Sequence, residues 1–350
     1  MKGRLCLFTI LTAGMTGLAD PSVMADIQEF CRLRWESARE DISQKDLEDS
    51  WDRQKKIKVR AEPVLHREFA KLADGELTPL VRDLLKESGD IWVWTFCTTA
   101  LHAQMPTYSV DVQAKVLEKV FDTVPDLRRG RVLRSFVTDL PKEAFAGKAI
   151  QQWLVDTING GISGGGFYFI LTEESVRAVS KAVTADMKKF SKEREHSSSN
   201  LLSLMSAVFL ASRGDDDAVA LLDSLLDRLD INSLLDTVYV IPAAAMPGNE
   251  KLIKKIINIA VMDKRVRING EDCIPKETSF AHEAAKACAL VIEGFPAVVR
   301  YKYDDEAKGK VRQWIEANPA YTLKAYTPRV FLKEHFNNII PAMRRVMEKE

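Results

Sequence analysis

The feature that most constrains the fold is a pattern of amphipathic helix pairs separated by short polar turns. Residues 201–211 are almost wholly apolar, and Gly214 and Asp215 then interrupt the run. Residues 217–226 again place apolar side chains three and four positions apart, the spacing that gathers them on one face of an α-helix. A glycine in the left-handed conformation ends helices, and acidic residues favour the first turn of the next one. The sequence therefore predicts a helical hairpin over residues 201–229.

The same pattern returns at the length expected of helical solenoid units. Asp215 and Asn249, at corresponding turns, stand 34 positions apart. The candidate hairpins cover residues 90–124, 126–159, 201–229, 234–260 and 279–317. We expect an all-α chain of about five such hairpins, stacked into a right-handed α-α superhelix.

Residues 209–222 read FLASRGDDDAVALL. They resemble the HEAT and armadillo-like α-solenoid repeat family, in which an apolar helix, a glycine-aspartate turn and an Ala-Val-x-x-Leu-Leu helix follow one another. The resemblance covers residues 201–318 and, more weakly, 90–159. It implies a HEAT-like solenoid that acts as an interaction scaffold, and it carries over no catalytic residues. The chain departs from a regular array at residues 159–166 and 263–278.

These patterns divide the chain into five parts. The parts are a signal peptide at 1–25, an N-terminal helical cap at 26–89, a first half of helical repeats at 90–200 with a Gly-rich loop at 160–166, HEAT-like repeats at 201–319, and a C-terminal helical cap at 320–350. The end units of a solenoid need a polar outer face because no neighbour covers them. The many charges before the first repeat fit such a cap.

The amino terminus has the composition of a signal peptide. Lys2 and Arg4 precede an apolar stretch, residues 5–19, which is shorter than the roughly 18 residues that a membrane span needs. Small residues three apart fit cleavage after Ala25, with Ala19 as a second possibility. We expect cleavage near Ala25, export to the periplasm or the extracellular space, and no membrane span in the mature chain. The alternatives are an uncleaved anchor or a buried amino-terminal helix.

Four cysteines, Cys31, Cys97, Cys273 and Cys288, follow this segment. An exported protein meets an oxidising compartment, in which cysteines can pair. Cys97 and Cys288 lie in apolar sequence, where free cysteine packs as a small hydrophobe. We therefore expect thiols in the core, with a Cys273–Cys288 disulfide as the leading exception.

Charge balance bears on the choice of partner. The chain has 50 basic and 50 acidic side chains, mixed along its length. A formal charge of zero gives no long-range field to attract nucleic acid or anionic lipid. We expect a protein or another macromolecule as the partner, and no nucleic acid.

Two motifs suggest chemistry, and neither fits its structural requirement. The GISGG sequence at residues 161–165 has the spelling of a hydrolase nucleophile elbow, but a helix-like segment enters it where a strand is required. We therefore interpret Ser163 as a loop residue. His282 and Glu283 begin like an H-E-x-x-H zinc helix, but Lys286 occupies the place of the second imidazole. The sequence predicts no catalytic residue, no cofactor and no metal site.

Acidic runs at residues 215–217 and 304–306 open predicted helices. They lack the alternating ligand spacing of a calcium loop, so we interpret them as helix caps. The Arg-Gly-Asp sequence at 213–215 spells an integrin-recognition tripeptide, but its place at a hairpin turn accounts for each residue.

This pattern favours a protein that binds another macromolecule. We expect an exported, non-enzymatic α-solenoid scaffold whose second helices, at residues 217–229, 250–260 and 304–317, line the binding groove. The alternative is an exported hydrolase of the α/α-toroid type, which also alternates helices and uses acidic residues in a central cavity. A less favoured alternative is an α/β enzyme with strands at residues 167–171, 238–241 and 298–303.

Overall fold

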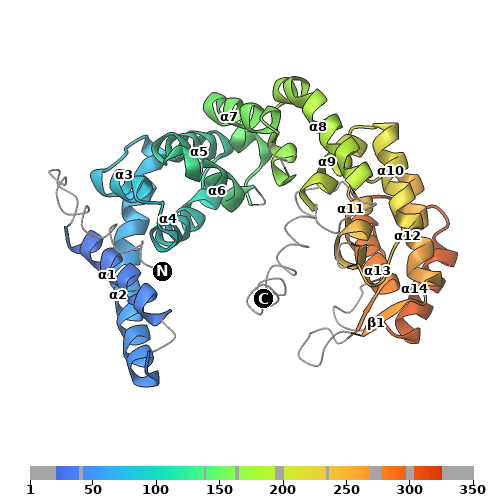
Figure 1. Cartoon of the computed structure of the whole chain (residues 1–350), viewed down its shortest axis with the longest axis horizontal. Helices are drawn as coiled ribbons and strands as arrows, with labels where there is room; N and C mark the ends of the chain where they lie inside the picture. The colour runs from blue at the N-terminus through green and yellow to red at the C-terminus, as the bar shows by residue number, and fades with distance from the viewer. Residues whose placement is uncertain are drawn as a thin grey trace. The chain divides into compact units, whose positions relative to one another are not determined.

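The computed structural model describes residues 21–38, 42–137, 139–161, 165–193, 201–233, 236–268, 277–296 and 303–324 (Figure 1). Helices form nearly all of the regular structure in these ranges, which confirms the all-α class. The exception is an antiparallel ribbon of two short strands, β1 (Val266–Ile268) and β2 (Glu277–Ser279). Contacts within the chain divide it into two compact units.

The first unit holds the chain up to Ser135 together with Glu143–Gly147. Its α-helices are α1 (Pro21–Ser37), α2 (Gln44–Ala70), α3 (Pro79–Lys86), α4 (Ile91–Gln104), α5 (Val110–Thr123) and α6 (Asp126–Phe136). Short 3-10 turns follow some of them, namely η1 (Lys71–Asp74), η2 (Met105–Thr107) and η3 (Lys142–Phe145).

The core of the first unit lies where α2 packs against α1 and α4. Helix α2 buries Ile57, Ala61, Leu65 and Phe69, which recur at every fourth position and so share one face. Helix α1 contributes Phe30, whose ring meets that of Phe96 in α4 edge-on at a centroid distance of 5.0 Å. Such aromatic contacts add to the free energy gained by burying apolar surface.

Helix α1 also contains the bond after Ala25, where the sequence predicts cleavage. Val23 and Met24 are only 4% and 6% exposed. Asp26 accepts two hydrogen bonds from Arg60 of α2, at 2.6 and 3.1 Å. Cleavage after Ala25 would therefore remove the first turn of the helix and two core side chains. Ala19 lies outside the described residues.

The second unit holds Phe136–Lys142 and the chain from Lys148 onwards. Its α-helices are α7 (Lys148–Asn159), α8 (Glu173–Glu193), α9 (Leu201–Ala211), α10 (Asp216–Asp227), α11 (Ile241–Ala245), α12 (Glu250–Met262), α13 (Phe280–Val291) and α14 (Asp305–Ala317). It also has a 3-10 segment, η4 (Gly165–Ile170), and a π-helical turn, η5 (Asp236–Val240).

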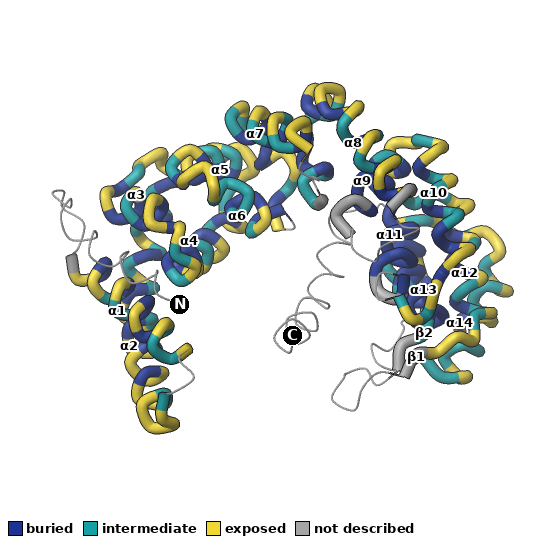
Figure 2. The backbone as a smooth tube through the Cα atoms, in the orientation of Figure 1, coloured by how far each residue is buried: buried dark blue, intermediate teal, exposed yellow. Residues whose placement is uncertain are grey.

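The later helices of this unit form two layers. Helix α11 packs against α9 and α13 in one layer, and α12 packs against α10 and α14 in the other (Figure 1). Contacts between the layers join α9 to α10 and α12 to α13. Buried side chains gather where the layers meet, and exposed residues mark the outer side of α10, α12 and α14 (Figure 2).

One predicted helix is divided in the structure. The sequence predicts a helical hairpin over residues 234–260, but the described part of its first half has η5 followed by the five-residue α11. Pro242 lies in the first turn of α11. Proline lacks an amide hydrogen and favours the first turn of a helix, so a new helix begins there.

Two of the strands expected for an α/β enzyme are helical instead. Phe167–Ile170 belongs to η4, and residues 238–241 belong to η5 and the start of α11. The third expected strand, at 298–303, lies outside the described residues except for Tyr303, which is not in a strand. The α/β alternative is therefore wrong for the two segments that the structure describes. The periodicity of short apolar runs does not distinguish strand from buried helix.

The cysteines in the described ranges are core residues. Cys31, Cys97 and Cys288 are buried free thiols, as the sequence predicts. Because Cys288 is free, the Cys273–Cys288 disulfide that we considered is absent from the structure. Cys273 itself lies outside the described residues. Among the helices of the described ranges, none has the length and hydropathy required to span a bilayer.

Candidate functional site

The layer formed by α10, α12 and α14 is called the outer layer from here on. Its three helices begin in the same way. The side chains of Asp215, Asn249 and Asp304 accept hydrogen bonds from backbone amides three residues further on, at 2.9, 3.3 and 3.0 Å. Each bond satisfies an amide that no helical carbonyl can reach. Gly214 and Gly248, with φ of 84° and 65°, provide the left-handed backbone in the turns before α10 and α12. The two acidic runs thus cap helices, as the sequence predicts.

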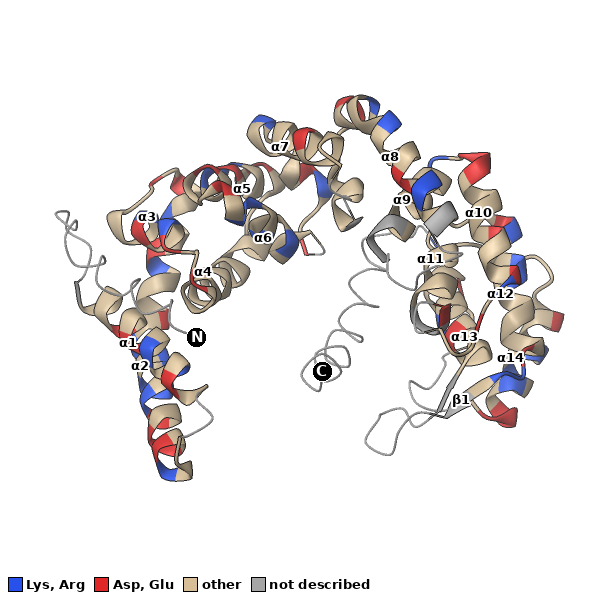
Figure 3. Cartoon of the chain, viewed as in Figure 1, with Lys and Arg blue, Asp and Glu red and all other residues tan. Residues whose placement is uncertain are grey.

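The segments that the sequence predicts as a binding surface lie together in this layer. Residues 217–229 and 250–260 contribute α10 and α12, and residues 304–317 contribute α14. Their apolar sides face the core, where Leu222, Ile256 and Val311 are buried. Their outer sides carry charged residues, with aspartates on α10 and mainly lysines on α12 (Figure 3).

Ion pairs join α10 to α12. Asp223 of α10 pairs with Lys251 and Lys255 of α12, each at 2.8 Å, and Asp227 pairs with Lys255 at 2.7 Å. Hydrogen bonds from Lys251 and Lys255 lower the pKa of the Asp223 carboxyl. Desolvation acts to lower the pKa of Lys255, but hydrogen bonds to the two aspartates outweigh it and raise that pKa. This network stabilises the layer and neutralises charge between the two helices.

Hydrogen bonds from side chains to backbone carbonyls join α12 to α14. The Tyr303 hydroxyl donates to the Ala260 carbonyl at 2.9 Å, and Arg312 donates to the Val261 carbonyl at 3.3 Å. These bonds satisfy carbonyls in the last turn of α12, where helical donors are lacking. Met262, at the same end of α12, is 71% exposed. Met262 is therefore an apolar side chain exposed among polar ones at this end of the layer.

Helix α13 holds the residues that resemble a zinc motif. The Glu283 carboxylate forms an ion pair with Lys286 on the next turn, and burial raises the pKa of Glu283. The ring of His282 stacks on that of Tyr303 at a centroid distance of 5.6 Å. Lys286 thus provides a counter-ion for Glu283 at the position where a zinc helix would have its second imidazole. Among the residues that the structure describes, no group of three or more His, Cys, Asp or Glu side chains is arranged to hold a metal ion.

The loop with the nucleophile-elbow spelling follows a helix. Helix α7 ends at Asn159, and Gly161 has a φ of 83°. Ser163 lies outside the described residues. An elbow requires a strand before the nucleophile, whereas α7 is helical as the sequence predicts. The helix before this loop therefore gives no support to a nucleophile elbow.

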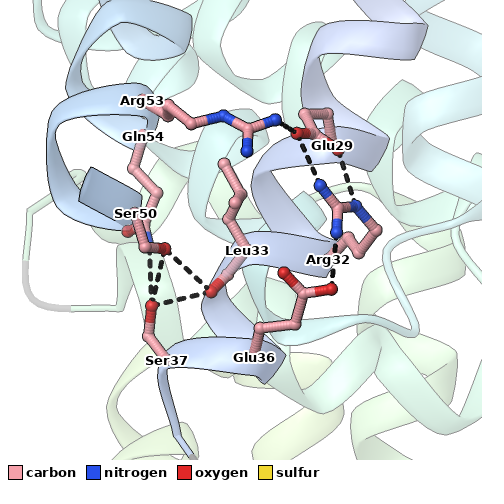
Figure 4. Close-up of polar contacts among 8 residues, drawn as sticks. All are labelled: Glu29, Arg32, Leu33, Glu36, Ser37, Ser50, Arg53 and Gln54. Carbon is pink, nitrogen blue, oxygen red and sulfur yellow. Dashed lines mark hydrogen bonds and ion pairs between the residues drawn. The ribbon is translucent and has the colours of Figure 1, made fainter. Parts of the chain in front are cut away.

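A second group of polar side chains lies between α1 and α2 in the first unit (Figure 4). Ser50 and Gln54, which are buried, and the half-buried Ser37 bond one another, with distances of 2.8 Å between the hydroxyls and 3.2 Å from Gln54 to each. The Leu33 carbonyl accepts from Ser37 at 2.8 Å. Buried polar groups satisfied in this way specify how two helices pair.

Charged residues continue this network at the surface. Glu29 accepts from Arg32 of its own helix and from Arg53 of α2, and Glu36 accepts from Arg32 (Figure 4). The hydrogen bond from Arg32 is the main cause that lowers the pKa of Glu29. An open hollow of about 470 Å³ lies beside the network, with Asp46 and Asp49 on its wall. Since its charges are mostly paired within the hairpin, we assign this region a structural role.

Comparisons with known proteins identify no relative. No protein-family model matches the chain, and neither the curated proteins nor the solved structures contain a significant match. The resemblance of residues 209–222 to HEAT and armadillo-like repeats therefore stays a prediction.

Proposed function

We propose that this protein is an exported, non-enzymatic helical-repeat scaffold that binds a partner protein through the outer side of α10, α12 and α14. The observation that carries the proposal is the repetition in the second unit. Successive hairpins place equivalent helices in one layer, each begun by the same side-chain cap. Repetition of this kind gives solenoids an extended binding surface. A right-handed HEAT-like superhelix is the arrangement that we infer from it.

The chemistry of the outer layer supports binding to a protein. Ion pairs between α10 and α12 neutralise much of its charge. Asn258 is exposed and Met262 is 71% exposed, both on α12. Protein interfaces combine such exposed methionines with a polar rim and avoid uncompensated charge at their centre.

The proposal can be tested with a photo-crosslinking amino acid in place of Asn258 or Met262. Crosslinks from these positions to a discrete protein of the secreted or envelope fraction are expected. Lys181, exposed on α8 of the same unit, provides the matched control position. Crosslinks of equal yield from Lys181, or none from α12, would contradict the proposed use of this layer.

Export is part of the same proposal, and the structure bears on the site of cleavage. We propose cleavage after Ala19, because this leaves α1 intact from Pro21, with Val23 and Met24 in the core. Cleavage after Ala25 would leave a cavity where those two side chains pack. The intact mass of the chain secreted by an export-competent bacterial host will distinguish the two.

A start at Asp20 is expected for the secreted chain, and Ala19→Gln is expected to block processing whereas Ala25→Gln is not. A start at Asp26 would contradict the proposed site. An uncleaved chain retained in the cytoplasm would contradict export itself.

A further inference from the structure

Helix α6 in the first unit carries an arginine face that the proposed binding layer does not include. Arg128, Arg131 and Arg134 stand three positions apart, so they project from neighbouring parts of the helix surface. Arg134 is exposed, and the other two are partly exposed. Basic residues are prominent on α6 (Figure 3).

These arginines have no carboxylate partner among the described residues. Arg129 on the same helix differs from them, because it pairs with Asp126 at 2.8 Å and lies over the Phe121 ring at 5.0 Å. Arg134 instead donates to a backbone carbonyl, that of Gly130, at 3.2 Å. The arginine face therefore has no direct ion pair within the part of the chain that the structure describes.

One acidic residue does act electrostatically on this face, but it is engaged elsewhere. Asp90 attracts Arg131 without forming a hydrogen bond to it. Its Oδ1 atom accepts from the backbone amides of Trp92 and Val93, at 2.7 and 3.3 Å, and thereby caps α4. Asp90 therefore offsets part of the charge of Arg131 from a distance while its Oδ1 atom caps another helix.

Of the three arginines, Arg131 has a guanidinium nitrogen that lacks a hydrogen bond. Its Nη1 atom is buried and has no hydrogen-bond partner. Desolvation and the neighbouring charges of Arg128 and Arg134 lower the pKa of its guanidinium. A buried donor without an acceptor is costly, and the carboxylates of an incoming acidic segment would offset the charge of the three arginines.

An apolar side chain lies beside this charge. Leu127 is 96% exposed, although its neighbours on α6, Val132 and Leu133, are fully buried. Arginine next to exposed leucine suits a partner segment that is both acidic and partly apolar.

We propose that Arg128, Arg131 and Arg134, together with Leu127, bind an acidic polypeptide segment of a partner protein through its carboxylates. This inference rests on the proposed scaffold function and names the chemistry of one of its contacts. Guanidinium groups bind carboxylates through paired hydrogen bonds, which gives both attraction and orientation.

A peptide suits this face better than the other anionic macromolecules. A nucleic-acid site requires a longer basic track with aromatic side chains on which bases stack. A membrane site requires a broad apolar face, whereas the apolar exposure of α6 is concentrated at Leu127. Three arginines around one leucine match a short segment.

The test uses the full chain and a fluorescein-labelled peptide that consists mostly of glutamate with a few leucines. A length of about twelve residues suits the recognition of a short segment. Fluorescence anisotropy measures its affinity at low and at physiological salt. Replacing Arg128, Arg131 and Arg134 together by glutamine is expected to weaken binding about tenfold or more. Added salt is expected to weaken binding to the unmodified chain and to have little effect on this variant.

A matched control removes three positive charges elsewhere. Arg177, Lys181 and Lys188 are exposed on α8, and their joint replacement by glutamine is expected to change the affinity by less than about twofold, because it removes the same number of charges and leaves the arginine face intact. Arg134→Glu, at an exposed position, tests the face by a single change if the triple variant does not fold.

Several results would overturn the inference. They are no binding by the unmodified chain, equal losses in the α6 and α8 variants, or tighter binding to polyuridylate or to phosphatidylglycerol vesicles than to the peptide. Failure of the scaffold function gives a different result, because crosslinks from α12 would be absent while the peptide still bound α6.

Discussion

Helices α12 and α6 both present charged side chains to solvent, but they differ in what those charges contact. On α12, Lys251 and Lys255 meet Asp223 of the neighbouring helix. On α6, Arg128 and Arg131 meet no carboxylate among the described residues, and Arg131 has a buried donor without an acceptor. Charges that are paired between helices stabilise the fold, whereas charges held unpaired favour an external anion. The comparison separates residues that maintain the structure from residues available for binding.

The largest effect on stability is expected from the buried side of α12. Ile256 is fully buried, so Ile256→Ala removes apolar contacts and leaves a cavity. The free energy of unfolding is expected to fall by about 3 kcal/mol. Urea denaturation followed by circular dichroism measures this, with the exposed Asn258→Ala as the control. An equal loss in both variants would show that α12 is not anchored by its apolar side.

The anchoring of α12 was predictable from the sequence because its apolar residues recur with helical periodicity. Leu252, Ile253 and Ile256 are all buried, as that periodicity predicts. The caps at Asp215 and Asp304 were predictable for a similar reason, since a cap acts within a few residues of its own position. Local interactions are those that a sequence pattern reports best.

The arginine face of α6 was not predictable in the same way. The sequence shows the arginines, but whether each has a partner depends on which side chains the fold brings near. Arg129 finds Phe121 and Asp126, whereas Arg131 lies near an aspartate that already caps another helix. The equal totals of acidic and basic residues also conceal a local excess. Pairing across helices is a tertiary property, and neither composition nor periodicity determines it.

A smaller effect is expected where α12 pairs with α10. Lys255→Gln removes the amine shared by Asp223 and Asp227, and the free energy of unfolding at neutral pH is expected to fall by about 1 kcal/mol, since the pair is partly buried. Lys254→Gln is the control, because its 3.5 Å pair with Glu250 is largely exposed and is expected to contribute less than about 0.5 kcal/mol.

The pH dependence of this difference follows from Asp223. Its pKa in the folded protein is lowered, so its contribution is present above the unfolded-state pKa of about 3.9 and is lost as the pH falls through the lower folded value. The difference between the unmodified chain and Lys255→Gln should therefore diminish in acid. A difference independent of pH would show that the lysine acts through packing of its aliphatic stem.

The smallest effect, and one of opposite sign, is expected on α6. Arg131→Met keeps a long apolar stem but removes a desolvated charge that lies beside two other arginines and leaves one donor unsatisfied. We expect the free energy of unfolding to stay constant or to rise by up to about 1 kcal/mol, because replacing an uncompensated charge by an apolar group is often neutral or stabilising. Affinity for the acidic peptide should fall in the same variant.

The matched comparison is Arg129→Met. This change removes an ion pair, a contact with the Phe121 ring and a hydrogen bond to the Phe121 carbonyl at 3.3 Å, so it should lower the free energy of unfolding. Thermal melts of the two variants measure the contrast, and a loss at Arg131 as large as that at Arg129 would place Arg131 among the residues that maintain the fold.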